Sequence, residues 1–423
     1  MIYYICKIKK IDAEAITVLV SKKSKKGSKL SELFSFLLPF TVGATWYGSQ
    51  MGSGTASGAL HMTYFVRFGY YGVIFSAIAL LVELWFYFWV VELSRRTQCY
   101  STKEFLQTAF HPFEKILMPA YDIMAICSFS AATASCMAGA AELLNSYLGV
   151  NYYVWLAVIV AVFMAITMFG INAIRAVGSV LTVAMVTIII LFLAVGIPAN
   201  WESIVSNWSA RAVGEGEKYG NVGWAVWHIF LFASMQVPTA SILSTACKGC
   251  VKSLRDSLKA VLFGFVCLFI TMVPISLLLF GRWPENLESG TAIYVLEAIE
   301  HLEGAAFIKA AYPLLLASAF VTTGPNYIFN LSERWSKISL WDNLKNPKNP
   351  LKKLWFRKFS VAALFCAVCV VMAVNGFGFV TNTILPLTGY GWFVIFLIFA
   401  IFVPIKVIRS YSHSKKSAVG SLK

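Results

Sequence analysis

Long apolar stretches recur along the whole chain, and no soluble-sized segment separates them. A helix needs about 20 mostly apolar residues to cross a bilayer. The composition agrees, because 58% of the residues are hydrophobic and 13% are charged, whereas a soluble chain carries about 25% charged residues. The sequence therefore predicts one all-α integral membrane domain with ten transmembrane helices: residues 33–65, 71–91, 113–148, 153–169, 174–195, 222–247, 258–280, 306–329, 359–374 and 380–403.

The charges of the predicted loops indicate the orientation of the chain in the membrane. The formal net charge is +15, from 35 Lys and Arg against 20 Asp and Glu. Lys and Arg concentrate in cytoplasmic loops, and an error of one helix would invert the pattern beyond it. With both termini cytoplasmic, all but five of the basic residues fall on the cytoplasmic side, the exceptions being Arg67, Arg211, Lys218, Arg282 and Lys309. The basic excess therefore indicates membrane orientation, and no nucleic-acid partner is predicted.

Two of the predicted helices are interrupted at their centres. The first contains Gly48, Gly52, Gly54 and Gly58, and the sixth contains the segment 234–238, SMQVP. These interruptions stand five helices apart, and paired broken helices are typical of transporters built from inverted repeats. We therefore predict a 5+5 inverted repeat, divided into a basic cytoplasmic tail (1–32), a first repeat (33–195), an extracellular loop (196–221), a second repeat (222–405) and a second basic cytoplasmic tail (406–423).

Glycine and proline are also common in membrane helices for reasons of packing alone, and this is our interpretation of Pro386 in the tenth helix. In the first helix, by contrast, unwinding would free carbonyl groups near Gly48 and Met51, which suit a hard cation. It would also free N–H groups at the start of the outer half, which suit an anionic group such as a carboxylate. The predicted substrate-binding residues are Gly52, Ser53, Gly54 and Thr55 on the first helix, Phe232, Ser234 and Gln236 on the sixth, and Tyr327 on the eighth.

The sequence around the first interruption resembles a known family. The segment 52–58, GSGTASG, is followed by 65–72, FVRFGYYG, and the third helix contains 137–144, MAGAAELL. These segments are similar to those of the YkvI-like bacterial membrane proteins of the amino-acid/polyamine/organocation superfamily. The resemblance implies the ten-helix fold of the leucine transporter and a place in the plasma membrane, in a bacterium the inner membrane. The family usually carries a polar pair where this chain has Ala59-Leu60, so no role is expected for that pair.

The wider fold implies a Na⁺ site between the first and eighth helices. In the leucine transporter and its relatives, the eighth helix supplies one carbonyl and, three and four positions on, two adjacent hydroxyls. The first helix supplies two carbonyls three residues apart, just before a Gly-x-Gly. The matching residues here are Gly48, Met51, Ala319, Thr322 and Thr323. The alternative is that the two threonines bond back to carbonyls of their own helix.

Two other features point to function. Glu83 lies near the centre of the second predicted helix, where a charged group is costly and is a functional hypothesis by default. Burial favours its protonated form, so Glu83 is a candidate proton carrier, with a structural hydrogen bond to a neighbouring helix as the alternative. The amphipathic, acidic segment 291–302 is typical of a short lid helix between the seventh and eighth helices.

Motifs of other function classes are absent from the sequence. There is no phosphate-binding loop for ATP-driven transport and no catalytic motif of a membrane enzyme. Ten dissimilar helices do not suggest a channel built from repeated subunits. The first interruption contains no Asp, which favours a neutral or zwitterionic solute over a metal or a cationic amine. We therefore predict a Na⁺-coupled symporter of a small, amino-acid-like solute that needs no cofactor and no oligomer. The alternatives are a proton-coupled transporter that uses Glu83 and a sensor on the same fold.

Overall fold

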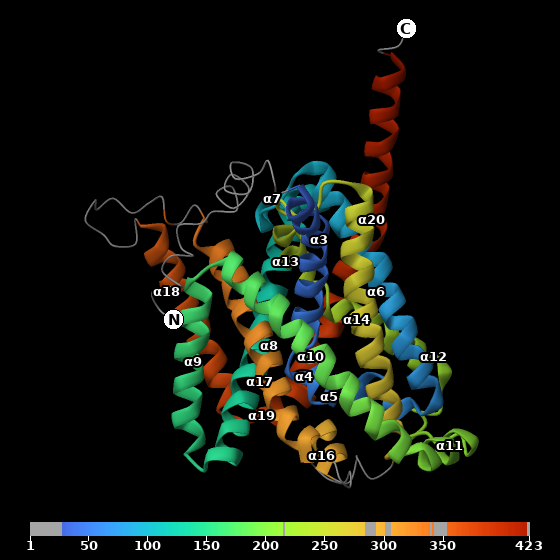
Figure 1. Ribbon diagram of the computed structural model, residues 1–423. Helices are drawn as coiled ribbons and strands as arrows, with labels where there is room; N and C mark the ends of the chain where they lie inside the picture. Colours follow the sequence, from blue (N-terminus) through green and yellow to red (C-terminus); the bar gives the residue numbers. More distant parts are fainter. Residues whose placement is uncertain are drawn as a thin grey trace.

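The computed structural model describes residues 28–214, 216–283, 293–300, 306–338, 341 and 353–420, and this part of the chain is a bundle of helices without a strand (Figure 1). Seven of the described helices are long and apolar enough to cross a membrane, or eight if one bent pair counts as a single span. Large apolar side chains face outward from the bundle; Leu364 and Val371, for example, are each 71% exposed. Such a surface suits lipid, and the chain is a multi-pass membrane protein.

Each predicted segment contains at least one helix. The first five correspond to α3 (Ser28–Gln50) with α4 (Ser53–Ala56) and α5 (Ala59–Tyr64), to α6 (Tyr70–Thr97), α8 (Glu114–Leu148), α9 (Tyr152–Met168) and α10 (Ile171–Ala199). The last five correspond to α12 (Val222–Met235) with α13 (Thr239–Ala246), to α14 (Leu254–Gly281), α17 (Ala306–Trp335), α18 (Leu354–Ala373), and α19 (Phe377–Phe379) with the π-helical turn η4 (Val380–Ile384) and α20 (Leu385–Gly420).

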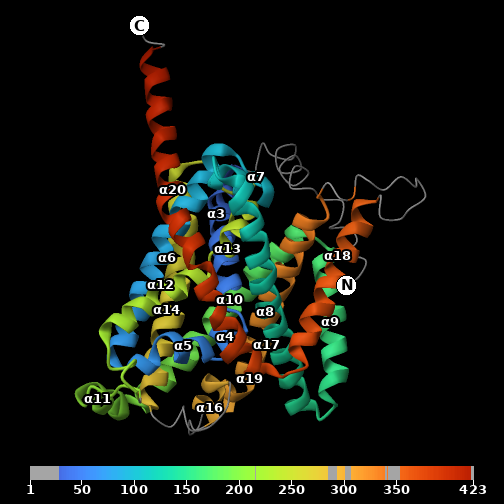
Figure 2. The same cartoon turned by 180° about the vertical axis from the view of Figure 1, so that it is seen from behind.

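Short helices join these segments at the two ends of the bundle. The turn η1 (Val66–Phe68) joins α5 to α6, and α7 (Thr102–Phe110) lies at the same end as the long C-terminal part of α20 (Figure 2). At the opposite end lie α11 (Trp201–Ser209), within the predicted loop 196–221, and α16 (Tyr294–Glu300), within the predicted lid segment (Figure 1). The tail residues 1–27 and 421–423 and the lid residues 291, 292, 301 and 302 lie outside the described residues.

The inner half of the first segment, α3, lies in the interior of the bundle. Trp46, Tyr47 and Met51 are almost completely buried, as expected for a helix that is apolar on all sides. Two glycines allow α14 to approach it closely: a Cβ on Gly43 would lie 2.3 Å from the carbonyl oxygen of Ala260, and one on Gly264 would lie 2.5 Å from the ring of Trp46. This close crossing holds the first interruption at the centre of the protein.

Pro386, which we interpreted as a packing residue, lies in the tenth segment beside side chains of other helices. The π-helical turn η4 immediately precedes Pro386, which has no N–H group with which to continue an α-helical ladder. The Tyr64 hydroxyl, at the end of α5, donates a hydrogen bond to the Pro386 carbonyl at 2.9 Å. Ser234, near the end of α12, donates to the Gly389 carbonyl at 2.8 Å. Pro386 thus lies where the tenth segment contacts both broken helices.

Candidate functional site

The first helix is interrupted twice. The inner half, α3, ends at Gln50, and Met51 and Gly52 are not helical. One helical turn, α4, follows, and the chain is interrupted again at Gly58, whose φ of 88° lies in the left-handed region that favours glycine. Gly52 and Gly58 thus mark the two interruptions, whereas Gly48 and Gly54 lie within α3 and α4. The sequence predicted a single interruption.

The second broken helix bends by 46° between α12 and α13. Neighbouring tyrosines bond to carbonyl groups at this bend. Tyr87 on α6 donates to the Gln236 carbonyl at 2.6 Å, and Tyr121 on α8 donates to the Pro238 carbonyl at 3.4 Å. Because buried carbonyls need partners, these hydroxyls stabilise the bend.

Tyrosines on α17 do the same for the first broken helix. Tyr327 donates to the Ser49 carbonyl at 3.0 Å, and Tyr312 donates to the Ala56 carbonyl at 2.5 Å. The two contacts lie on either side of the non-helical residues. A single helix, α17, therefore holds both halves of the first interruption.

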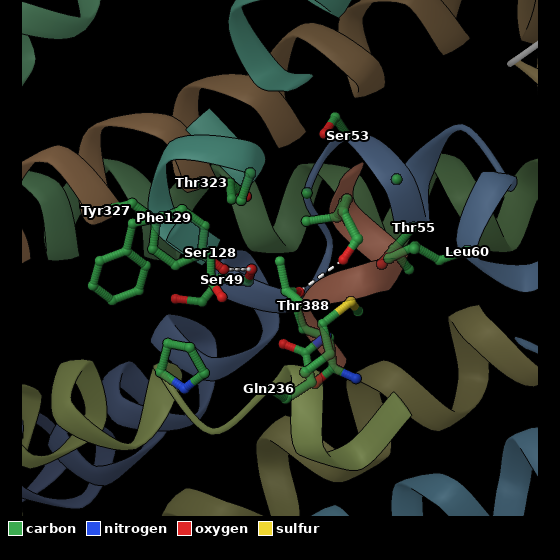
Figure 3. A pocket seen from close by; sticks show the side chains of 17 residues that line it. Ser49, Ser53, Thr55, Leu60, Ser128, Phe129, Gln236, Thr323, Tyr327 and Thr388 are labelled. Atoms are coloured by element: carbon green, nitrogen blue, oxygen red, sulfur yellow. Dashed lines mark hydrogen bonds between the residues drawn. The ribbon is translucent and has the colours of Figure 1, made fainter. Parts of the chain in front are cut away.

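The two interruptions meet at a small cavity of about 40 Å³ (Figure 3). This is room for a few waters or one small chemical group. The lining is uncharged and comes from five helical segments: Ser49, Gln50, Gly52, Ser53, Gly54, Thr55, Leu60, Ser128, Phe129, Ala132, Met235, Gln236, Pro238, Thr323, Tyr327, Leu385 and Thr388.

An aromatic pair forms one wall of this cavity. The rings of Phe129, on α8, and Tyr327 stack with centroids 4.8 Å apart and planes inclined by 20°. Thr55 and Leu60 lie across the cavity from this pair (Figure 3). The cavity thus has a wall of two aromatic rings that faces the short helices α4 and α5.

A cluster of oxygen atoms lies directly beside the cavity, between α3 and α17. Thr323 donates to the Gly48 carbonyl at 2.7 Å. The Thr322 hydroxyl is 3.4 Å from the same carbonyl and 3.0 Å from the Ala319 carbonyl. A Cβ on Gly52 would lie 3.0 Å from Cγ2 of Thr323, so this glycine permits the close approach. The second predicted carbonyl, that of Met51, belongs to the first non-helical residue.

The predicted substrate residues divide into two groups. Gly52, Ser53, Gly54, Thr55, Gln236 and Tyr327 line the cavity. Phe232 and Ser234 lie elsewhere: Phe232 packs edge-on against Tyr64 and Phe65, and Ser234 bonds to α20.

Two further segments line the cavity with residues that were not among the predicted ones. From α8 come Ser128, Phe129 and Ala132, and from the start of α20 come Leu385 and Thr388. The run of small residues in α8, such as 130–141, is a signal that could have indicated the first group, because small side chains let other helices approach.

The side of the cavity toward α11 and α16 is covered. The backbone N–H of Val295, in α16, donates to the Ser57 carbonyl at 3.0 Å, and Val295 is fully buried. A Cβ on Gly58 would lie 3.0 Å from the side chains of Leu279 and Val295. The short helix α16 therefore packs over Gly58, where the first helix is interrupted for the second time.

A chain of hydroxyl groups joins three segments near the cavity. Ser53 on α4 lies 2.6 Å from Ser135 on α8, and Ser135 lies 2.7 Å from Thr381 in η4. All three side chains are buried. The first interruption is thereby attached to α8 and to the π-helical turn.

Ion pairs lie toward the other end of the bundle, where α7 lies. Asp122 on α8 accepts two hydrogen bonds from Arg334 on α17, at 3.0 and 2.8 Å. Glu92, near the end of α6, accepts hydrogen bonds from Arg95 and from Ser257 on α14. These contacts tie helices together on the side of the cavity opposite α16.

Glu83 lies in α6 and is 1% exposed. Its two carboxyl oxygens are buried without a hydrogen-bond partner. The nearby side chain of Gln50, which lines the cavity, accepts a hydrogen bond from the Trp46 indole at 2.7 Å. Gln50, on α3, is thus the group from which Glu83 would receive the structural hydrogen bond that is the alternative to a proton carrier.

No protein-family model matches the chain, and no curated protein matches it. Solved structures are similar to it in fold. MhsT in complex with L-phenylalanine aligns over 88% of this chain and 97% of that chain, with a TM-score of 0.61 and 13% identity. A Na⁺-coupled sialic acid symporter in a substrate-bound outward-open state aligns over 86% and 79%, with a TM-score of 0.60 and 12% identity. The Eremococcus coleocola manganese transporter aligns over 89% and 88%, with a TM-score of 0.57 and 14% identity. The chain therefore has the leucine-transporter fold.

Proposed function

We propose that this protein is a secondary transporter that moves a small neutral or zwitterionic solute together with Na⁺ by alternating access. The observation that carries the proposal is the position of the oxygen cluster around Gly48. It joins the interrupted first helix to α17 at the edge of the cavity. An ion bound there would act directly on the backbone that also forms the solute site.

The proposed Na⁺ ligands are the carbonyls of Gly48, Met51 and Ala319 and the hydroxyls of Thr322 and Thr323. In the structure the two hydroxyls donate toward the Gly48 and Ala319 carbonyls. Four of the five groups thus already converge, and rotation of the hydroxyl hydrogens would present oxygen lone pairs to a cation. Oxygen-only ligand sets suit hard cations.

The proposed solute site is the cavity beside this cluster. Its lining carries hydroxyl, amide and aromatic groups but no charged side chain, which favours a solute with no net charge. The first-turn N–H groups of α4, from Ser53 to Thr55, have no partners within the helix and would receive a carboxylate. MhsT holds L-phenylalanine, and the stacked pair of Phe129 and Tyr327 would contact a comparable apolar group here. Phe232 and Ser234 would then act outside the cavity lining, through their contacts with α5 and α20.

The architecture that we propose has ten membrane crossings in a 5+5 inverted repeat, with both termini cytoplasmic. The two interruptions stand five segments apart in the sequence and line one cavity, which supports the repeat. The excess of basic residues on one side supports the orientation. Membership of the YkvI-like group, and with it a bacterial inner-membrane location, rests on the sequences of the first and third helices.

The structure suggests how the cycle would proceed. The side with α16 is covered by contacts to Ser57 and Ala56, and the opposite side is tied by the Asp122–Arg334 pair. Release of one set of contacts at a time would expose the cavity alternately. Na⁺ and solute would each raise the affinity for the other, since such coupling is reciprocal.

A thermal-stabilisation screen of small neutral and zwitterionic solutes, with and without Na⁺, tests this proposal first. We expect at least one solute to stabilise the purified protein more strongly in Na⁺ than in K⁺. Uptake of that solute into proteoliposomes then separates transport from sensing, because a sensor would bind the solute without flux. Equal uptake with and without any ion gradient would overturn secondary transport.

A further inference from the structure

The buried carboxyl group of Glu83 has no role in the cycle described above. Its side chain is 1% exposed, and neither oxygen has a hydrogen-bond partner. Removing an unpaired carboxylate from water costs several kcal/mol. An acid in such a place therefore calls for a function.

Gln50 links this carboxyl group to the first interruption. It is the last residue of α3, between the proposed ligands Gly48 and Met51, and it lines the cavity while lying beside Glu83. The oxygen of its side-chain amide accepts a hydrogen bond from the Trp46 indole at 2.7 Å. Its amide nitrogen donates to the sulfur of Met272 at 3.7 Å, which is a weak acceptor. An ionised Glu83 would be a stronger acceptor for the same N–H group.

Tyr87 links Glu83 to the break between α12 and α13. It lies one turn further along α6, and its hydroxyl donates to the Gln236 carbonyl at 2.6 Å. The ring of Tyr87 also packs on Trp46, with centroids 4.7 Å apart. A change of charge at Glu83 would thus alter the electrostatic environment of both broken helices.

The described helices that pack against this part of α6 supply no counter-charge to Glu83. α13 contains no charged residue, α14 has its charged residues only up to Lys259, and α20 has them only from Lys406 onward. The His228 ring of α12 lies further out, against Phe68 and Trp224. Other titratable side chains of this part of the bundle are Tyr47 on α3, His61 and Tyr64 on α5, Tyr87 on α6, Tyr121 on α8, Cys267 on α14, Tyr327 on α17 and Tyr390 on α20.

We propose that Glu83 binds a proton in competition with the cation at Gly48, so that Na⁺ binding releases a proton from Glu83. The inference rests on the proposed function in that it takes the cation to be Na⁺. All five proposed ligands are neutral and the cavity lining is uncharged, so Na⁺ alone would add an uncompensated charge to the interior. Exchange of Na⁺ for a proton leaves the net charge of the region unchanged, which removes much of this electrostatic penalty.

The sign of the pH dependence follows from this exchange. Where Glu83 holds its proton, Na⁺ has to displace it, so Na⁺ binding strengthens as the pH rises. For one proton released per Na⁺ bound, the apparent Na⁺ affinity rises roughly tenfold per pH unit in that range. Reciprocally, Na⁺ lowers the proton occupancy of Glu83.

Infrared difference spectroscopy of the reconstituted protein, with Na⁺ alone as the probe, tests the proposal. We expect Na⁺ in place of K⁺ to remove the C=O band of one protonated carboxyl group. A pH indicator in weak buffer should report one proton released per Na⁺ bound. Glu83→Gln, which mimics the neutral acid, abolishes both signals, whereas Glu83→Asp retains them. The matched control Glu142→Gln removes an exposed carboxyl group of α8 and leaves both signals unchanged.

The possible failures are distinguishable. If Na⁺ has no effect on the melting temperature of the wild-type protein at any pH, the proposed Na⁺ site is wrong. The proposed competition between Na⁺ and the proton is then wrong as well. If Na⁺ stabilises the wild type and Glu83→Gln equally at every pH, Na⁺ binding stands and the exchange at Glu83 is overturned. Loss of the carboxyl band in Glu142→Gln in place of Glu83→Gln also overturns it.

Discussion

The hydroxyl group of Thr323 donates a 2.7 Å hydrogen bond to the carbonyl of Gly48, across 275 positions of sequence. The bond connects the unbroken helix α17 to the end of the broken helix α3. It satisfies a carbonyl that the interruption has freed, and a cation coordinated by both oxygens would replace it. The same pair of residues therefore relates the stability of the interruption to the occupancy of the proposed ion site.

Replacement of Thr323 by valine removes one proposed ligand while keeping the shape of the side chain. We expect Thr323→Val to weaken Na⁺ binding by about tenfold or more, which corresponds to a loss of about 1.4 kcal/mol. The measurement is the Na⁺ concentration that gives half of the maximal thermal stabilisation.

The matched control for this substitution is Thr187→Val on α10. Thr187 is exposed, and its hydroxyl bonds to the Val183 carbonyl of its own helix at 2.8 Å. We expect its Na⁺ dependence to equal that of the wild type. Equal weakening in both variants would show that the loss of a threonine hydroxyl acts generally and would remove the support for a site at Thr323.

Replacement of Tyr327 by phenylalanine tests the tyrosine that holds the inner half of the first interruption. The stack on Phe129 would remain, but the Ser49 carbonyl would lose a 3.0 Å hydrogen bond. A buried carbonyl left without its partner costs about 1–3 kcal/mol, so Tyr327→Phe lowers the melting temperature and the uptake rate. The control Tyr153→Phe changes a side chain that is 60% exposed and leaves both within error; an unaffected Tyr327→Phe would contradict the account.

Replacement of Gly58 by alanine tests the docking of the lid. The residue has a φ of 88°, and an added methyl group would lie 3.0 Å from Val295 in α16. The left-handed backbone alone costs alanine about 1–2 kcal/mol, and displacement of α16 follows from the contact. We expect faster hydrogen exchange in α16 and a lower melting temperature.

The control for the lid is Gly178→Ala in α10, because an added Cβ there meets nothing within 4 Å and its φ is not positive. We expect unchanged exchange in α16 and unchanged or slightly higher stability, since alanine favours helix. Unchanged exchange in α16 for Gly58→Ala as well would show that the lid does not depend on this contact.

The Asp122–Arg334 pair links α8 to α17 at the end opposite the lid, and both side chains are largely buried, at 20% and 12% exposed. Either single substitution, Asp122→Asn or Arg334→Gln, leaves the partner charge unpaired and lowers the melting temperature. A double-mutant cycle should give a coupling energy of about 0.5–3 kcal/mol. The swapped pair Asp122→Arg with Arg334→Asp should recover uptake; single variants that add without coupling would contradict a role for the pair.

The bundle and its interruptions could be predicted from the sequence because their causes are local. Apolar runs of membrane-spanning length and the glycines around Gly52 act within one helix. The double interruption of the first helix is local as well, since Gly58 adopts the left-handed conformation. The leucine-transporter fold predicted from the glycine-rich first helix is confirmed by the structural similarities.

Five of the seventeen residues that line the cavity could not be predicted because they come from α8 and the start of α20, where the sequence shows no break. Phe129 on α8 and Thr388 on α20 are ordinary residues of apolar helices, and only the packing of those helices directs them to the cavity. The same packing places Phe232 against Tyr64 and Phe65, and Ser234 against Gly389, outside the cavity lining. The π-helical turn before Pro386 is a further case, since proline alone does not distinguish a π turn from a simple kink.

Uptake into proteoliposomes of the solute that the stabilisation screen identifies tests the central claim most directly. An inward Na⁺ gradient at equal pH on both sides should drive accumulation in the wild-type protein. Thr322→Ala combined with Thr323→Ala should abolish the effect of Na⁺ and leave only passive equilibration. Undiminished Na⁺-driven accumulation in the double variant would contradict the assignment of the ion site, and uptake that ignores the Na⁺ gradient in the wild type would contradict Na⁺ coupling altogether.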